Sequence, residues 1–167
     1  MASTATTPNT DAQLAEQTAR FYDALSSLIR VYQFRDRDRI CCHDVSVSQC
    51  YALEALVRHG PLTLNELAAY LYLDKSTASR VVDALERKGL LRRTDNPEDK
   101  RSVRLVATPA GKQRHSLIIR GIHERERGLL AEFDPSVRAG IIDVLGRLAS
   151  AAAQRVETTG GVCCCID

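Results

Sequence analysis

The feature that most restricts the fold of this 167-residue chain is an abrupt change of pattern at Gly89. Before it, apolar residues recur at three- and four-residue steps, which is typical of amphipathic helices. After it, LLRRT and SVRLVAT are predicted to be two short strands. The polar stretch DNPEDKR between them contains Asn96-Pro97 and is predicted to be a turn. The sequence therefore predicts consecutive helices followed directly by one β-hairpin.

Each of the three helices before the hairpin begins at a residue that favours an N-cap, namely Ser46, Thr63 and Asp74. Gln49 and Glu66 follow the first two of these residues by three positions, which completes two capping-box signatures. The helix after Ser46 is expected to close at Gly60, and the helix after Asp74 at Gly89. The middle helix, LNELAAYL, is short.

Longer helices flank this region. One is predicted over about residues 11–39, where Leu14, Phe21 and Leu28 belong to an apolar face. Thr108-Pro109 is an N-cap followed by proline at the first helical position, which starts a long helix. Asp134-Pro135 begins a last helix through roughly residue 155. The predicted class is mainly α: a winged helix-turn-helix with long N- and C-terminal dimerisation helices.

A winged helix-turn-helix suggests DNA binding, because its third helix can lie in the major groove while the hairpin reaches along the backbone. The helix after Asp74 presents small polar and basic residues in its first two turns: Lys75, Ser76, Thr77, Ser79 and Arg80. Arg93 on the first strand adds a cation. The overall net charge is +2, but residues 75–115 hold 11 Lys/Arg against 5 Asp/Glu, so the positive charge is concentrated in this segment. No catalytic motif is recognised around the histidines, and we expect no enzyme.

The stretch DKSTASRVVDALERKGLLRRTDNPEDKRSVRLVATPAG resembles the core of the MarR family of regulators. The family's wing signature matches Asp99, Arg101, Thr108 and Gly111, with Ala107 where the family has leucine. The resemblance implies that Arg101 enters the minor groove, with Lys100 beside it and Asp99 supporting the wing. It also implies a homodimer on double-stranded DNA, and two-fold symmetry would match a pseudo-palindromic operator.

The expected organisation has four parts. Residues 1–10 are expected to be a disordered leader, and residues 45–107 the DNA-binding domain. Residues 11–40 and 108–156 are expected to form the helical dimerisation region, and residues 157–167 a flexible cysteine-rich tail. No secretory signal or membrane span is evident, so we expect a cytoplasmic protein that does not engage a membrane.

Five of the six cysteines lie in two clusters, Cys41-Cys42 and Cys163-Cys164-Cys165, while Cys50 is expected to be a small buried hydrophobe. If the last helix runs back antiparallel, the two clusters could meet. Thiolates prefer soft ions, so arsenite or antimonite is the favoured ligand, with zinc or cadmium as other candidates and His43 as a further ligand. Binding would control the affinity of a repressor for its operator. The open alternatives are a thiol redox switch and a repressor that responds to a phenolic or aromatic small molecule.

Overall fold

The computed structural model describes residues 9–41, 43–97, 99 and 102–158. The chain divides into two compact units, residues 1–47 and residues 48–167, and each is described by itself. The first unit contains α1 (Asn9–Cys41), a single helix of 33 residues. The helix predicted over residues 11–39 is thus confirmed, and apolar side chains along it are exposed: Leu14, Phe21, Leu25, Leu28, Ile29 and Phe34.

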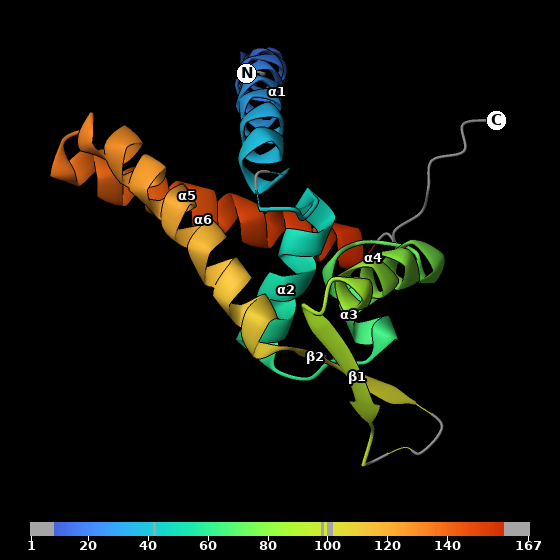
Figure 1. Cartoon of the computed structure of the whole chain (residues 1–167). Coiled ribbons are helices and arrows are strands. Elements are labelled where there is room, and N and C mark those ends of the chain that lie inside the picture. The colour runs from blue at the N-terminus through green and yellow to red at the C-terminus, as the bar shows by residue number, and fades with distance from the viewer. Residues whose placement is uncertain (1–8, 42, 98, 100–101, 159–167) are drawn as a thin grey trace, which may run out of the picture. The chain divides into compact units, whose positions relative to one another are not determined.

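The second unit holds the remaining elements, shown with α1 in Figure 1. In chain order they are α2 (Val47–His59), α3 (Leu64–Tyr70), α4 (Lys75–Arg87), β1 (Leu91–Asp95), β2 (Val103–Ala107), α5 (Pro109–Ala131) and α6 (Pro135–Thr158). The predicted order of elements and the mainly helical winged helix-turn-helix class are confirmed.

The core of the second unit is formed by the apolar faces of α2, α3 and α4 and by the inner face of the hairpin. Its most deeply buried large side chains include Leu53, Leu67, Val82, Leu85, Leu91 and Leu105. Cys50 is only 2% exposed within this core, which confirms the prediction of a small buried hydrophobe. Removing these side chains from water supplies the main driving force that holds the helices and the hairpin together.

The helix ends follow the predicted signals closely. Thr63 and Glu66 form a capping box, and Asp74 caps α4. Gly60 and Gly89 follow α2 and α4 with φ of +80° and +68°, a left-handed conformation that glycine adopts without steric cost.

The first strand begins one residue later than predicted. The sequence places its start at Leu90, but the Leu90 N–H donates to Leu85 O at 2.9 Å and so completes the end of α4. The antiparallel register then pairs Leu91 with Ala107 and Asp95 with Val103. Leu62, in the turn before α3, exchanges backbone hydrogen bonds of 3.2 and 2.7 Å with Leu105, which fastens the hairpin to the helical part of the unit.

The start of α5 is tied to the end of α4. Thr108 caps α5, its hydroxyl donates to Gly89 O at 2.7 Å, and its N–H donates to Leu90 O at 3.1 Å. A Cβ placed on Gly111 would lie 2.0 Å from Leu90 O and 3.2 Å from Leu53 Cδ2. The glycine of the wing signature is therefore required by the close approach of the two backbones.

The last helix, α6, leaves many apolar side chains exposed: Ile142, Val144, Leu145, Leu148 and Val156. Over the residues that the structure describes, none of the helices combines the length and apolar character that spanning a membrane requires.

Candidate nucleic-acid interface

The first turn of α4 is organised around the carboxylate of Asp74. Three donors converge on it: the Ser76 hydroxyl at 2.6 Å, the Thr77 hydroxyl at 2.6 Å and the Thr77 backbone N–H at 2.9 Å. These hydrogen bonds, led by the one from Ser76, hold the pKa of Asp74 well below its ordinary range. The carboxylate therefore stays ionised and fixes the beginning of the helix.

This network determines which hydrogen bonds the first two turns can still make. Because their hydroxyl hydrogens are directed at Asp74, Ser76 and Thr77 retain oxygen lone pairs, which suit the amino groups of adenine or cytosine. Lys75 and Arg80 are exposed cations on the same turns and can donate to phosphate or guanine. The helix thus combines donors and acceptors over a short length of its exposed face.

The opposite face of α4 packs into the core through Ala78, Val81, Val82 and Leu85, which are 9% exposed or less. Ser79, a predicted DNA contact, lies between the two faces and is half-buried. Lys75 and Arg80 lie on the exposed face. The helix is therefore held by its apolar side while its polar first turns stay accessible.

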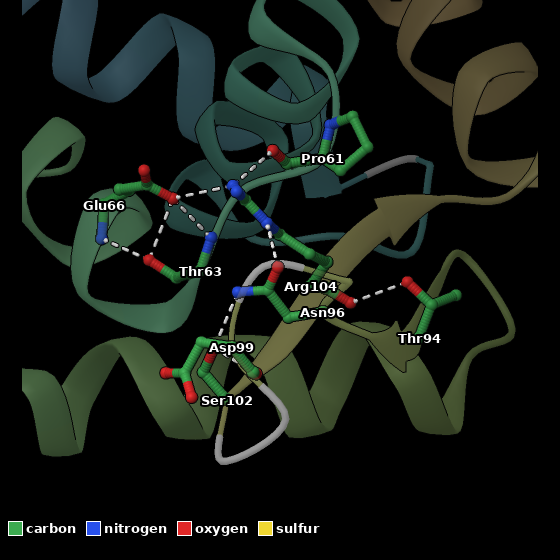
Figure 2. Close-up of polar contacts among 8 residues, drawn as sticks. All are labelled: Pro61, Thr63, Glu66, Thr94, Asn96, Asp99, Ser102 and Arg104. Atoms are coloured by element: carbon green, nitrogen blue, oxygen red, sulfur yellow. Dashed lines mark hydrogen bonds and ion pairs between the residues drawn. The ribbon is translucent and has the colours of Figure 1, made fainter.

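The base of the wing is braced by Arg104 on β2, as Figure 2 shows. Its Nε donates to Asn96 Oδ1 at 3.3 Å, and its Nη1 lies 3.4 Å from both Pro61 O and Glu66 Oε2. Asn96 is only 5% exposed, and its amide donates to Ser102 Oγ at 2.7 Å. One guanidinium thus connects the two strand ends of the hairpin with the segment that leads into α3.

Glu66 joins this arrangement to the capping box of α3. Its Oε2 accepts from the Thr63 N–H at 2.7 Å and from the Thr63 hydroxyl at 2.8 Å. The backbone hydrogen bond from Thr63, followed by the one from its hydroxyl, lowers the pKa of Glu66, and the nearby Arg104 acts in the same direction. The carboxylate is therefore anionic at neutral pH and supports both the helix start and the wing.

Arg93, predicted to contact DNA, forms ion pairs with two carboxylates of α4. Its Nη2 lies 2.6 Å from Asp83 Oδ1, and its Nη1 pairs with Glu86. These acidic groups compete with phosphate for the guanidinium, so in this conformation Arg93 holds β1 against α4. Its role toward DNA stays a prediction.

The predicted wing-tip residues Lys100 and Arg101 lie outside the described residues. Asp99 is exposed, and its carbonyl accepts hydrogen bonds from the Ser102 N–H at 3.0 Å and the Ser102 hydroxyl at 3.2 Å. The proposed hold of the Asp99 carboxylate on Arg101 therefore stays a prediction.

Most of the predicted metal ligands also lie outside the described residues: Cys42, Cys163, Cys164 and Cys165. Cys41 ends α1, but its side chain is likewise not described, and His43 is half-buried. Among the side chains that are described, no group of three His, Cys, Asp or Glu residues is placed to hold a metal ion. The cysteine site stays a prediction.

The bracing residues Arg104 and Asn96 were not singled out by the sequence pattern. Arg104 lies in a strand whose neighbours Val103, Leu105 and Val106 are apolar, which is a weak signal that this cation has an internal partner. The identity of that partner depends on a contact 38 residues away in the chain, with Glu66. The residues around Arg104 in the sequence do not indicate this contact.

Comparison with known proteins agrees with this geometry. Residues 43–102 match the model of the MarR family. The transcriptional repressor MdtR of Bacillus subtilis is 31% identical over 77 residues, which are 46% of this chain and 50% of MdtR, so the match spans half of that relative. A MarR family protein from Bacillus stearothermophilus superposes with a TM-score of 0.76 at 23% identity, over 83% of this chain and 96% of that one. A MarR regulator from Methanosarcina mazei superposes with a TM-score of 0.72 at 25% identity, over 81% and 98%.

The fold and the matched segment together define a winged helix-turn-helix protein. Residues 43–102, about a third of the chain, are similar to the MarR family.

Proposed function

We propose that the protein is a homodimeric repressor that binds a pseudo-palindromic site on double-stranded DNA. The observation that carries this proposal is the pairing, within one unit, of an exposed polar first turn of α4 with a braced hairpin beside it. Lys75 and Arg80 would contact phosphates and base edges in the major groove, with Ser76 as a hydrogen-bond acceptor. Repression is favoured because the similar protein MdtR is a repressor.

The exposed apolar residues of α1 and α6 support a dimer. Leu14 and Ile142 are each 60% exposed, and Phe21 and Leu145 are each 48% exposed. Large apolar side chains repeated along a helix usually mark an interface. Pairing through these helices would place two copies of α4 on half-sites about one helical turn (~34 Å) apart.

We further propose that a soft metal or metalloid ion, arsenite or antimonite above all, releases the repressor by binding thiolates of its two cysteine clusters. Support comes from the sequence: Cys41-Cys42 and Cys163-Cys164-Cys165 concentrate thiols in a way that a packed core does not need. Cys50, by contrast, is accounted for by the core.

One observation favours a second candidate, an organic anion as the inducer. A hollow of about 380 Å³ on the second unit is lined by Lys112, His115, Arg120 and His123 of α5, together with Val57 of α2. A carboxylate on an aromatic ring would find cationic partners and an apolar wall there. A redox response of the same thiols remains the third candidate, and one titration can separate the three.

DNA binding is tested with Arg101→Ala in a fluorescence anisotropy titration at several salt concentrations. We expect weaker binding and a shallower dependence on salt, because a wing contact to phosphate releases counterions. Arg147→Ala is the matched control: Arg147 is 81% exposed on α6, and its loss should leave both quantities unchanged. An Arg101→Ala variant with wild-type affinity and salt slope would remove this residue from the mechanism.

The inducer is tested by titrating the protein–DNA complex with arsenite, antimonite, cadmium, zinc, peroxide and salicylate in parallel. We expect release by arsenite or antimonite and its loss in a chain truncated after Gly161, with DNA affinity retained. Release by salicylate alone would favour the basic hollow, and release by peroxide alone would favour the redox alternative. A truncated chain that still responds normally to the metalloid would refute the role of the tail.

A further inference from the structure

A second hollow, of about 880 Å³, lies on the second unit between α2, α3 and the turn that leads to α4. Three tyrosines line it: Tyr51 from α2, Tyr70 from α3 and Tyr72 from the turn. They are 47%, 37% and 64% exposed, so three aromatic rings border the same open space. Such a volume is within the range of small-molecule sites.

Two of these tyrosines are positioned by defined contacts, one of the ring and one of the backbone. Tyr70 meets His59 edge to face, with ring centroids 5.1 Å apart and an interplanar angle of 63°. Tyr72 has φ of +53°, a left-handed conformation that is unusual for a bulky residue, and its N–H donates to Ala69 O at 3.1 Å. The turn thus keeps an aromatic ring at a position where glycine would be less strained.

The charged residues lining the hollow have one sign, since they are Glu54 and Glu66. Glu66 is kept anionic by its hydrogen bonds from Thr63, and the side chain of Glu54 is only 28% exposed. Their cationic neighbours, Arg58 at 3.6 Å from Glu54 and Arg104 at 3.4 Å from Glu66, are not part of the lining. Aromatic faces beside carboxylates attract cations, both through the ring quadrupole and through direct charge.

We propose that this hollow binds an organic cation with a bulky apolar body, held by the rings of Tyr51, Tyr70 and Tyr72 and by the carboxylates of Glu54 and Glu66. The site goes beyond the proposed function, because it is separate from the hollow on α5. It would also take a cation, whereas the hollow on α5 suits an anion. Tyr72 is two residues before Asp74, the cap of α4. A ligand packed on Tyr72 therefore contacts the turn that joins α3 to the recognition helix.

Binding is measured by isothermal titration calorimetry on the full chain, without DNA, using tetraphenylphosphonium. Tetraphenylborate has nearly the same shape and the opposite charge, so it is the matched probe for charge selectivity. We expect one phosphonium per chain, with about tenfold weaker binding in Glu54→Gln and in Tyr72→Gly. Because φ at position 72 suits glycine, Tyr72→Gly removes the ring without straining the turn. Circular dichroism checks that the variant is folded. Tyr22→Leu on α1, where Tyr22 is 68% exposed, controls for unspecific adsorption and should bind as the wild type does.

The proposal is overturned if the phosphonium does not bind, or if Glu54→Gln or Tyr72→Gly keeps an affinity within twofold of the wild type. It is also overturned if the borate binds and is likewise weakened by Tyr72→Gly, since the hollow would then be an apolar surface indifferent to charge. An effect of the phosphonium on DNA affinity rests on the proposed function and is measured separately. Failure of DNA binding therefore leaves the calorimetric result intact.

Discussion

The guanidinium of Arg104 on β2 lies 3.4 Å from the carboxylate of Glu66 in the first turn of α3. The same guanidinium reaches Asn96 and the carbonyl of Pro61, so a strand of the wing is joined to the entrance of the helix-turn-helix. These side-chain contacts, together with the backbone hydrogen bonds between Leu62 and Leu105, hold the base of the wing against the helical part of the unit.

We expect Arg104→Leu to lower the free energy of unfolding by about 1 kcal/mol, because it removes modest hydrogen bonds and one partly exposed ion pair. DNA affinity should fall as well, since the wing loses its brace. Urea denaturation and anisotropy titration measure the two effects. Arg104→Lys keeps the charge but not the forked geometry, and should recover only part of both. Wild-type DNA affinity in Arg104→Leu would show that the wing is positioned without this contact.

Gly111→Ala is expected to destabilise the fold by about 2 kcal/mol or more, because the new Cβ would collide with the backbone of Leu90. Gly128→Ala on the same helix is the matched control: a Cβ there meets nothing within 4 Å, and the variant should gain up to about 1 kcal/mol from helix propensity. Thermal and urea unfolding of the two variants check this. Equal stability of the two would contradict the close approach.

Asp74→Asn tests the ionised cap of α4. Asparagine also caps helices, so the fold should persist, but the charge is lost. The pKa of Asp74 is lowered in the folded state, so its contribution is present above the unfolded value of 3.8 and is lost as the pH falls. The stability advantage of the wild type over Asp74→Asn should therefore shrink as acid is added below about pH 4. A difference that stays constant with pH would mean that the charge does not contribute.

His115 on α5 should also make stability depend on pH, but through burial of its ring rather than through hydrogen bonds to a charged group. Burial lowers its pKa, against the nearby carboxylate of Glu54, and its Nε2 has no hydrogen-bond partner among the described residues. The unfolded chain then binds the proton more readily, so stability should fall as the pH drops through about 6.5. His115→Phe should flatten this part of the stability curve, whereas His123→Gln, at an exposed position of the same helix, should not. An unchanged curve in His115→Phe would assign the dependence to other groups.

The sequence predicted those parts of the fold that depend on local chemistry. Thr63, Asp74 and Thr108 are small polar residues that cap helices with their own side chains, so their positions could be identified from a few neighbouring residues. The helix following each cap was identified for the same reason. The family resemblance identified Gly111, but its cause, the carbonyl of Leu90, became evident only in the folded chain.

The parts that were missed depend on contacts between distant segments. Arg93 looked like a cation available to DNA because its partner Asp83 lies ten residues earlier on another element. The tyrosine-lined hollow combines Tyr51 of α2 with Tyr72 of the turn after α3, which lie 21 residues apart in the chain. In both cases a side chain's role is set by which surfaces the fold brings together, and no local pattern records that.

Thr108 donates hydrogen bonds to the carbonyls of Gly89 and Leu90, and Gly111 lies against the carbonyl of Leu90. The start of α5 is thus closely attached to the segment that follows α4. We therefore expect a tilt of the first turns of α5 to move the start of β1 and the end of α4 as well, because these contacts join the three elements. Under the proposed function, a ligand that moves the start of α5 would therefore also move the helix that contacts DNA.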